Sequence, residues 1–344
     1  MPEKFRDRRT SPHFKKGKFI NPIPTVVMQP GKAWNTLSQW FRDNDKRKPA
    51  VKPGPFRADP SAFTASQKGA IRVIWLAHST VLFTVGNKWF LTDPVWADTV
   101  SPFPWAGPRR FFDMPLAIDK LPPLEGVILS HDHYDHLDRK AIGRLAKGDH
   151  MFYCPLGLAR YLVKWGVNRE KIRELDWNEE IFTPGGIQLI SAPARHFSGR
   201  GLFNRNRTLW TSWIIRNEEQ SVFYSGDTGM HPGLEETGNK YGPFDLTVIE
   251  AGAYHPNWGS IHLGPENAVK AHRMLKGKIL LPVHWGTFRL ALHGWTEPAE
   301  DIITYAGKNG VSFLLPQPGE YISLPHETVV SGWWRRVPEV NPTG

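Results

Sequence analysis

The chain has 344 residues and a net charge of +10, and 40% of its residues are hydrophobic and 12% aromatic. This composition is too apolar for a disordered chain and sufficient for one large core or two modest ones. The single cysteine, Cys154, excludes an internal disulfide and a cysteine-rich zinc site. No apolar run suits a membrane span, and the charged start MPEKFRDRRT does not resemble a signal peptide. We therefore expect a cytoplasmic protein.

Positive charge is concentrated at the amino terminus. Residues 1–52 contain 13 Lys and Arg side chains against 4 Asp and Glu, so the rest of the chain is nearly neutral. A cluster of this kind attracts polyanions, such as anionic lipid headgroups, nucleic acid or an acidic partner. It is equally compatible with a solvated tail that aids solubility. The partner we expect is an anionic membrane surface, contacted peripherally through this segment.

The amino-terminal segment is also irregular and rich in proline. Within it, residues 33–42 predict one helix, because Trp34, Leu37 and Phe41 form an apolar stripe. A stripe of this kind packs against the body of the protein. These aromatic side chains are then not free to stack on bases, which disfavours nucleic acid as a partner. We expect residues 1–60 to form a basic, Pro-rich arm with one docking helix.

Residues 61–344 predict one α/β domain, in which β-rich runs and helical patterns alternate twice. The first series comprises strands 71–77, 79–85, 88–93 and 125–130 and helices 139–146 and 156–165. The second comprises strands 179–184, 186–192, 209–216, 221–227, 245–251 and 278–285 and helices 265–275 and 298–306. The simplest architecture that covers both faces of two sheets stacks them face to face with the helices outside.

The segment VILSHDHYDHLD, residues 127–138, carries the strongest chemical signal. Directly after apolar β-formers, it places four donors: His131, His133, Asp135 and His136. In an extended chain His131 and His133 project to the same side. The adjacent Asp135 and His136 point apart, so they reach a second position. Such nitrogen and oxygen donors suit Zn²⁺ better than Mg²⁺ or Ca²⁺, and Fe and Mn are also compatible.

Three further donors follow apolar runs elsewhere in the chain, namely His196, Asp227 and His284. Each lies at the carboxyl end of an expected strand, where a loop can carry it into a shared cleft. A lone histidine in such a place is more often structural. Here, however, the three residues together complete two coordination shells, which predicts that they are ligands.

We assign six donors to two Zn²⁺ ions: His131, His133 and His196 to one, and Asp135, His136 and His284 to the other. Asp227 bridges them, because a carboxylate has two oxygens. His78 and Asp93 lie at the edges of β-runs and are candidates for outer partners that orient the ligands. Asp93 is alternatively a plain turn residue before Pro94.

The expected metal pair determines the expected chemistry. Two ions about 3.5–4 Å apart lower the pKa of a shared water to about 7 and stabilise charge on a phosphoryl or carbonyl oxygen. The pattern therefore predicts hydrolysis of a phosphodiester, lactone, ester or amide, with the metal-bridging hydroxide as nucleophile. The sequence contains no G-x-S-x-G elbow and no phosphate-binding P-loop, which argues against the rival chemistries.

These residues resemble the metallo-β-lactamase superfamily, which implies a four-layer αβ/βα sandwich with a dinuclear site at the edge between the sheets. A narrower resemblance is to N-acyl-phosphatidylethanolamine-hydrolysing phospholipase D and its bacterial metal-dependent hydrolase relatives. The matching stretches include WLAHSTVLF (75–83), FLTDPVW (90–96), LPPLEGVILSHDHYDHLD (121–138), SGDTG (225–229) and GPFDLTVIEAGAY (242–254). The seven ligands implied by this resemblance are those already argued.

The resemblance also implies a function, phosphodiester cleavage in amphiphilic lipids of the N-acyl-phosphatidylethanolamine type. Asp135 and Asp227 would then act in catalysis, and Tyr134 and His262 would face the substrate. From the residues alone, His262 is equally compatible with a surface position before a helix. Residues 255–269 differ from the lipid-cleaving enzyme in length and charge, which leaves the substrate open. The alternatives are an acyl lactone or ester hydrolase with the same metals, and a non-enzymatic protein that tethers to membrane or nucleic acid.

Overall fold

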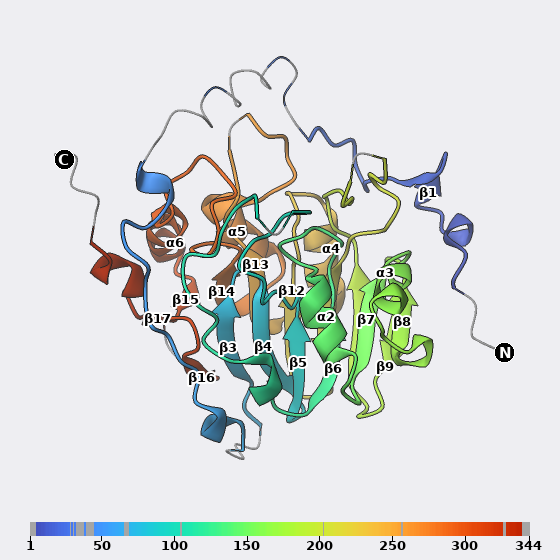
Figure 1. The fold of residues 1–344 in the computed structure, drawn as a ribbon, viewed down its shortest axis with the longest axis horizontal. Coiled ribbons are helices and arrows are strands. Elements are labelled where there is room, and N and C mark those ends of the chain that lie inside the picture. Colours follow the sequence, from blue (N-terminus) through green and yellow to red (C-terminus); the bar gives the residue numbers. More distant parts are fainter. Residues whose placement is uncertain are drawn as a thin grey trace.

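The fold is a stack of two β-sheets with helices on the outer faces (Figure 1). The helix predicted over residues 33–42 lies outside the described residues, apart from Ser38. The computed structural model describes residues 5–338 except 28, 30, 32–37, 39–44, 65–68, 104, 202, 256 and 326–327.

The first sheet has the strand order β16-β3-β4-β5-β6-β7-β8. Its strands are β3 (Arg72–Ala77), β4 (Thr80–Val85), β5 (Lys88–Thr92), β6 (Leu124–Ile128), β7 (Met151–Pro155), β8 (Ile172–Leu175) and β16 (Tyr321–Ser323). Strands β3, β4 and β5 pair antiparallel, whereas β5, β6, β7 and β8 pair parallel. The parallel half places the carboxyl ends of β5 and β6 side by side.

The second sheet has the order β17-β15-β14-β13-β12-β11-β10-β9. Its strands are β9 (Glu180–Phe182), β10 (Gln188–Ala192), β11 (Ser212–Arg216), β12 (Ser221–Tyr224), β13 (Phe244–Glu250), β14 (Gly277–Val283), β15 (Ser312–Leu315) and β17 (Val329–Val330). Antiparallel pairing from β9 to β12 again changes to parallel pairing from β12 to β15. The carboxyl ends of β12, β13 and β14 therefore also share one edge.

Burial on both faces explains the apolar runs in the sequence. Every residue of β3 and β4 is buried, which is typical of strands covered on both sides. Between the sheets, Phe83 belongs to the same apolar cluster as Trp213 and Val248. On the outer face of the first sheet, Val127 packs in a cluster with Ile142 of the covering helix. The helices are α2 (Arg139–Leu145), α3 (Ala159–Lys164), α4 (Gly233–Tyr241), α5 (Gly264–Met274) and α6 (Glu297–Lys308).

The amino-terminal segment contributes to this packing. It forms a hairpin of β1 (Phe14–Lys15) and β2 (Lys18–Phe19), and Phe19 is buried in a small cluster with Trp177 and Trp210. Among the described residues, no helix combines the length and the apolarity that crossing a membrane requires.

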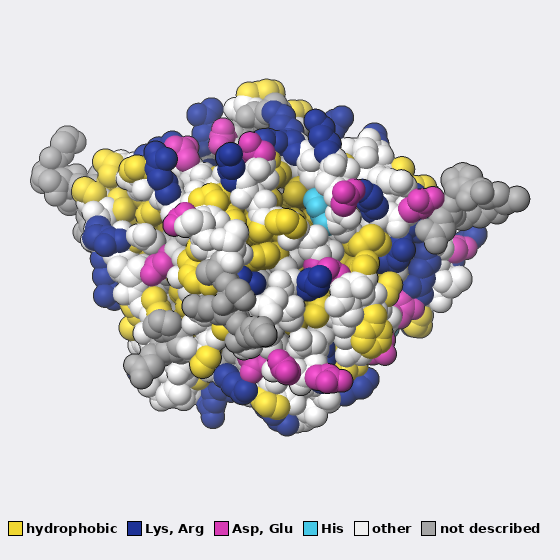
Figure 2. Space-filling model, turned by 90° about the horizontal axis from the view of Figure 1, so that it is seen from below, with side chains coloured by type: hydrophobic (Ala, Val, Ile, Leu, Met, Phe, Trp, Pro, Cys, Tyr) yellow, Lys and Arg dark blue, Asp and Glu magenta, His cyan; other side chains and the backbone are white. Residues whose placement is uncertain are grey.

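The two ends of the sheets differ in surface chemistry. Strands β5 and β14 point upward in Figure 1, so Figure 2 views the end at which the parallel strands begin. That face mixes basic and acidic side chains, and histidine is almost absent from it (Figure 2). Sheets of this kind place their ligand sites at the opposite end, where the carboxyl ends of the strands lie.

Candidate metal centre

The predicted donors meet at the carboxyl ends of the strands. In four groups of described residues, one potential ligand atom of each residue lies within 4.8 Å of the others, and two of these groups together contain all seven predicted donors. The other two combine Asp93 with His131 and His136, and His262 with Asp227 and His284. The first donor group is His131, His133, His196 and Asp227. The second donor group is His78, Asp135, His136 and His284. The division agrees with the grouping expected from the sequence, except that His78 joins the second donor group directly.

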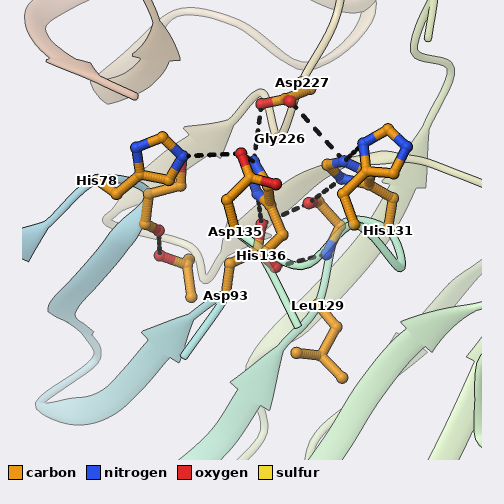
Figure 3. Close-up of polar contacts among 12 residues, drawn as sticks. His78, Asp93, Leu129, His131, Asp135, His136, Gly226 and Asp227 are labelled. Atoms are coloured by element: carbon orange, nitrogen blue, oxygen red, sulfur yellow. Dashed lines mark hydrogen bonds and ion pairs between the residues drawn. The ribbon is translucent and has the colours of Figure 1, made fainter. Parts of the chain in front are cut away.

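Asp227 lies between the two donor groups (Figure 3). Its Oδ1 is 3.1 Å from His136 Nε2 and 3.3 Å from His284 Nε2. Its Oδ2 is 3.7 Å from the Nε2 atoms of His131 and His196. One carboxylate oxygen therefore faces each group, which is the geometry that a bridging ligand requires.

Asp93 supports the loop that carries the central histidines. Its carboxylate accepts hydrogen bonds from the Ser130 amide at 2.7 Å, from the Ser130 hydroxyl and from the Tyr224 hydroxyl at 2.5 Å. The same carboxylate lies 2.6 Å from His136 Nδ1, which leaves Nε2 of that ring facing Asp227. These contacts favour the orienting role for Asp93 over that of a turn residue.

His78 lies closer to the donor atoms than expected for a residue that only orients the ligands. Its Nε2 is 3.1 Å from Asp135 Oδ2, and its ring centroid is 4.0 Å from that of His284. The backbone of His78 has a φ of 51°, an unusual value for a residue other than glycine. The sequence predicted that His78 orients the ligands from outside, whereas its ring nitrogen lies among the donor atoms.

His196 is held by two contacts that the sequence did not reveal. Its Nδ1 lies 3.0 Å from the carbonyl oxygen of Ile261, which directs Nε2 towards Asp227. Asn21 holds its backbone from both sides: Oδ1 accepts from the His196 amide at 2.9 Å, and Nδ2 donates to the His196 carbonyl at 2.7 Å. A segment near the amino terminus therefore fixes a residue far along the chain.

Burial and charge together favour cations at this centre. Burial lowers the pKa of His131 and His196 well below 6.5. Burial also opposes the charged form of His284, but Asp227 and Asp135 outweigh it and raise the pKa of His284 to about 9. Although burial disfavours their ionised forms, the pKa values of Asp135 and Asp227 fall well below 3.8 because His136 and other imidazoles surround them. The two carboxylates therefore stay ionised, and nearby positive charge stabilises them.

The chemistry of the donor atoms fits metal ions. His136 Nε2, His284 Nε2 and Asp227 Oδ1 are buried and make no hydrogen bond with any described residue. A buried polar atom without a partner costs about 1–3 kcal/mol, and a cation is a partner that satisfies all three atoms. Imidazole nitrogens with carboxylate oxygens are the donor set of zinc and related transition metals. Both donor groups can therefore hold a metal ion.

Comparison with protein families matches residues 88–285 to the Beta-lactamase superfamily domain. The chain belongs to the beta-lactamase superfamily. An uncharacterized protein of Mycobacterium tuberculosis is 37% identical over 336 residues, which cover 94% of this chain and 88% of the relative. N-acyl-phosphatidylethanolamine-hydrolyzing phospholipase D 1 of Caenorhabditis elegans is 37% identical over 225 residues, which cover 62% of this chain and 63% of that protein. The chain thus spans less than two thirds of that phospholipase.

Solved structures share the fold at low sequence identity. Igni18, a metallo hydrolase from Ignicoccus hospitalis, aligns with a TM-score of 0.57 and 18% identity over 75% of this chain and 100% of its own. An isothiocyanate hydrolase from Delia radicum gut bacteria aligns with a TM-score of 0.59 and 21% identity, and the alignment covers 73% of this chain and 98% of the hydrolase. The metallo-β-lactamase fold expected from the sequence is confirmed. With this family and these donor groups, the chain is a metal-dependent hydrolase of the beta-lactamase superfamily.

His262 borders a cavity next to the donor groups of this superfamily domain. Its side chain is 11% exposed, which contradicts the alternative of an exposed position on the surface. Its ring centroid is 5.1 Å from that of His196 and 5.4 Å from that of His284. The cavity has a volume of about 710 Å³, and its walls include Arg195, Tyr254, Trp258, His262, His293 and Glu297.

Tyr134 lies on the loop between His133 and His136 and is half-buried. Its hydroxyl donates a hydrogen bond to the carbonyl of Arg200 at 2.9 Å, and the guanidinium of Arg200 lies 3.9 Å from the centre of the tyrosine ring. Unlike His262, Tyr134 is not among the residues that line the 710 Å³ cavity. The expected contact of Tyr134 with the substrate therefore stays a prediction.

Proposed function

We propose that the chain is a dinuclear zinc phosphodiesterase of phospholipase D type that acts on N-acyl-phosphatidylethanolamine-like lipids. The position of Asp227, with one oxygen towards each donor group, carries this proposal. His131, His133 and His196 would hold one ion, and Asp135, His136 and His284 the other, with His78 close to the second. Iron or manganese would suit the same donors.

Two bound cations supply a hydroxide nucleophile at neutral pH and offset charge on a phosphoryl oxygen. The chain's own residues prepare the site for that role. Asp93 and the carbonyl of Ile261 fix the orientation of two imidazoles, so the nitrogens that face Asp227 are chosen before any substrate arrives. No serine or cysteine nucleophile is needed, and Cys154 is buried in the apolar cluster of the first sheet.

The proposed substrate class rests on two observations. The first is the similarity to phospholipase D relatives that act on N-acyl-phosphatidylethanolamine, one of which is 37% identical. The second is the cavity beside His262, whose volume of about 710 Å³ falls within the usual range for small-molecule sites. Its wall combines the guanidinium-bearing Arg195 with the apolar Trp258 and Leu263, which suits an amphiphilic phosphodiester.

We also propose that the enzyme is cytoplasmic and touches anionic membranes through its basic amino-terminal arm, residues 1–60, while residues 61–344 form the hydrolase domain. The β1–β2 hairpin supports this proposal, because Lys15, Lys16 and Lys18 are exposed on it. Basic side chains also gather around a second hollow of about 680 Å³, lined in part by Lys48, Lys52, Arg109, Arg110 and Arg289.

Turnover measurements on the zinc-loaded protein test the proposed function. We expect hydrolysis of bis-p-nitrophenyl phosphate and of N-acyl-phosphatidylethanolamine in vesicles, with little hydrolysis of an acyl lactone. Asp227→Asn removes one charge and the second carboxylate oxygen, so it should lower kcat/KM by more than the roughly 10- to 100-fold that loss of an outer partner causes. A strong preference for the lactone would contradict the phosphodiesterase proposal and support the acyl lactone or ester hydrolase.

A further inference from the structure

Glu250 is a fully buried carboxylate beside the metal centre that the proposed function does not use. It is the last residue of β13 and is 0% exposed. Strand β13 lies between β12 and β14, whose following loops carry Asp227 and His284. The sheet therefore delivers Glu250 to the same edge as these two donors. Glu250 is nevertheless in none of the groups of described residues whose potential ligand atoms converge.

The surroundings of Glu250 explain how a buried carboxylate is tolerated there. Its Oε1 accepts a hydrogen bond from the amide of Leu263 at 2.8 Å. Leu263 is the residue before α5, and the amino terminus of a helix stabilises negative charge. The amide of Glu250 donates to the hydroxyl of Ser225 at 3.0 Å, which holds the end of the strand in place. These contacts hold the backbone of Glu250 and one of its two carboxylate oxygens.

One face of the carboxylate points to His262. Oε1 lies 3.3 Å from His262 Nδ1. Both Nδ1 and Glu250 Oε2 are buried and make no hydrogen bond with any described residue. Each atom can satisfy the other after a small rotation of the side chain, whereas leaving both unpaired costs about 1–3 kcal/mol for each group. The two side chains therefore form a carboxylate–imidazole pair.

The other side of the imidazole faces the substrate cavity. His262 lines the cavity of about 710 Å³, and Nδ1 is the buried ring nitrogen on the Glu250 side. The Nε2 side is consequently the part of the ring that reaches the cavity. A neutral imidazole carries a single N–H, and its partner determines which nitrogen bears it.

We propose that Glu250 is a positioning residue for His262. Its carboxylate holds the tautomer with hydrogen on Nδ1, so that Nε2 presents its lone pair to the substrate cavity beside the metal centre. This inference deepens the proposed function and rests on it for the role of the cavity. The pairing itself follows from the contacts of Glu250 alone.

Nuclear magnetic resonance of the zinc-loaded protein with ¹⁵N-labelled histidine tests the pairing directly. We expect the His262 signals of the wild-type protein to show hydrogen on Nδ1. In Glu250→Gln, the Gln oxygen can keep the bond to the Leu263 amide at the position of Oε1. The rotation that brings Oε2 to Nδ1 in the wild-type protein then places the Gln NH₂ group there, as a donor. We expect the hydrogen of His262 to move to Nε2. A wild-type protein with hydrogen on Nε2 would overturn the inference without any variant.

Kinetics and metal content separate positioning from a general structural role. Glu250→Gln should lower kcat on the phosphodiester by about 10- to 100-fold with two metal ions retained. In a His262→Ala background, the same change should alter kcat by no more than about twofold, because the residue through which it acts is missing. Loss of a metal ion in Glu250→Gln, or an equally large effect in both backgrounds, would refute positioning through His262.

Glu174→Gln provides the matched control. Glu174 is also a buried carboxylate that accepts backbone hydrogen bonds, here from Gly157 at 2.7 Å and Ala159 at 3.3 Å, but it lies on β8 of the other sheet. The Glu174→Gln variant should keep the His262 tautomer and the kcat of the wild-type protein. A change of tautomer in this variant would count against the inference. Because the tautomer is read without turnover, a protein with the expected tautomer that cleaves no phosphodiester would refute the proposed function and leave the pairing supported.

Discussion

Asn21 shows how one residue acts on the metal centre without offering a donor atom. Its side chain makes two hydrogen bonds with the backbone of His196, at 2.9 and 2.7 Å. Asn21→Ala removes both, so the His196 imidazole should be less well oriented and zinc affinity should fall by roughly 10- to 100-fold. Competition for zinc with a chromophoric chelator measures this affinity.

Asn217→Ala is the control for Asn21→Ala. Asn217 also uses its side chain to accept backbone hydrogen bonds, from Glu219 at 3.0 Å and Gln220 at 2.7 Å, but it does so in the turn between β11 and β12. Its replacement should leave zinc affinity unchanged. If both variants bind zinc as the wild-type protein does, Asn21 has no role at the centre.

Burial of His272 should lower the free energy of unfolding in mild acid. The side chain is buried, its Nδ1 lies 2.7 Å from the hydroxyl of Thr247, and burial lowers its pKa to about 4. In the unfolded chain the pKa is about 6.5, so below that pH the unfolded state binds a proton that the folded state refuses. This residue therefore reduces the free energy of unfolding as the pH falls from about 6.5 towards 4, and has no effect above that window.

Urea unfolding at pH 7 and pH 5 of the wild-type protein and of His272→Gln, with metal removed from both, measures this effect. Between the two pH values the free energy of unfolding of the wild-type protein should fall by about 2 kcal/mol more than that of the variant. Equal losses in the two proteins would show that His272 is protonated in the folded state.

Among the elements, the β1–β2 hairpin carries three exposed lysines close together. It combines Lys15, Lys16 and Lys18 with Phe19, whose side chain is buried and anchors the hairpin to the body. Replacing the three lysines with glutamine keeps the anchor and removes three charges. At about 1 kcal/mol for each lysine near an anionic surface, binding to phosphatidylserine-containing vesicles should weaken by about 100-fold. Vesicle co-sedimentation at two salt concentrations measures this binding and its dependence on salt.

The control for the hairpin variant replaces three exposed lysines elsewhere, Lys147, Lys240 and Lys308, with glutamine. The two variants have the same net charge and differ only in where the charges were removed. The control should bind anionic vesicles more tightly than the hairpin variant. Equal binding by the two variants would mean that only net charge matters and that the hairpin is a solvated surface element.

At the scale of the whole molecule, the metal centre connects the two sheets. His131, His133, Asp135 and His136 follow β6 of the first sheet, whereas Asp227 and His284 follow β12 and β14 of the second. Ions bound between them would stabilise the packing of the sheets as well as the chemistry. Each site filled at about 1,000 times its Kd adds about 4 kcal/mol to the free energy of unfolding.

Removal of metal should therefore lower the Tm, and added zinc should restore it. Thermal unfolding followed by circular dichroism, with and without a chelator, measures the shift. The carboxylates of Asp135 and Asp227 would then depend on the surrounding imidazoles alone to offset their negative charge. An unchanged Tm after complete removal of metal would contradict a metal centre that holds the sheets together.

Local sequence determined the parts of the fold and site that depend on short spacings. The run at 127–138 places donors within one loop, and long apolar runs such as 71–77 read as strands. Strand β7 (Met151–Pro155) was missed, because a short buried apolar run cannot be told from a helical one by its period. Strand β8 (Ile172–Leu175) was missed for a different reason: its sequence IREL has two charged residues in the middle, so it contains no apolar run.

Which distant side chains meet depends on how the two sheets stack. The sequence predicted Asp227 as a bridging ligand, and the stacking of the two sheets set which donors each of its oxygens faces. It also brought His78 into the second donor group and placed Asn21 and Glu250 beside His196 and His262. Asn21 and His196 are 175 positions apart in the chain, and His78 and His284 are further apart still, so no local pattern marks these partners. The spacing of residues determines which donor side chains one loop carries, whereas the packing of the sheets determines which distant residues those side chains contact.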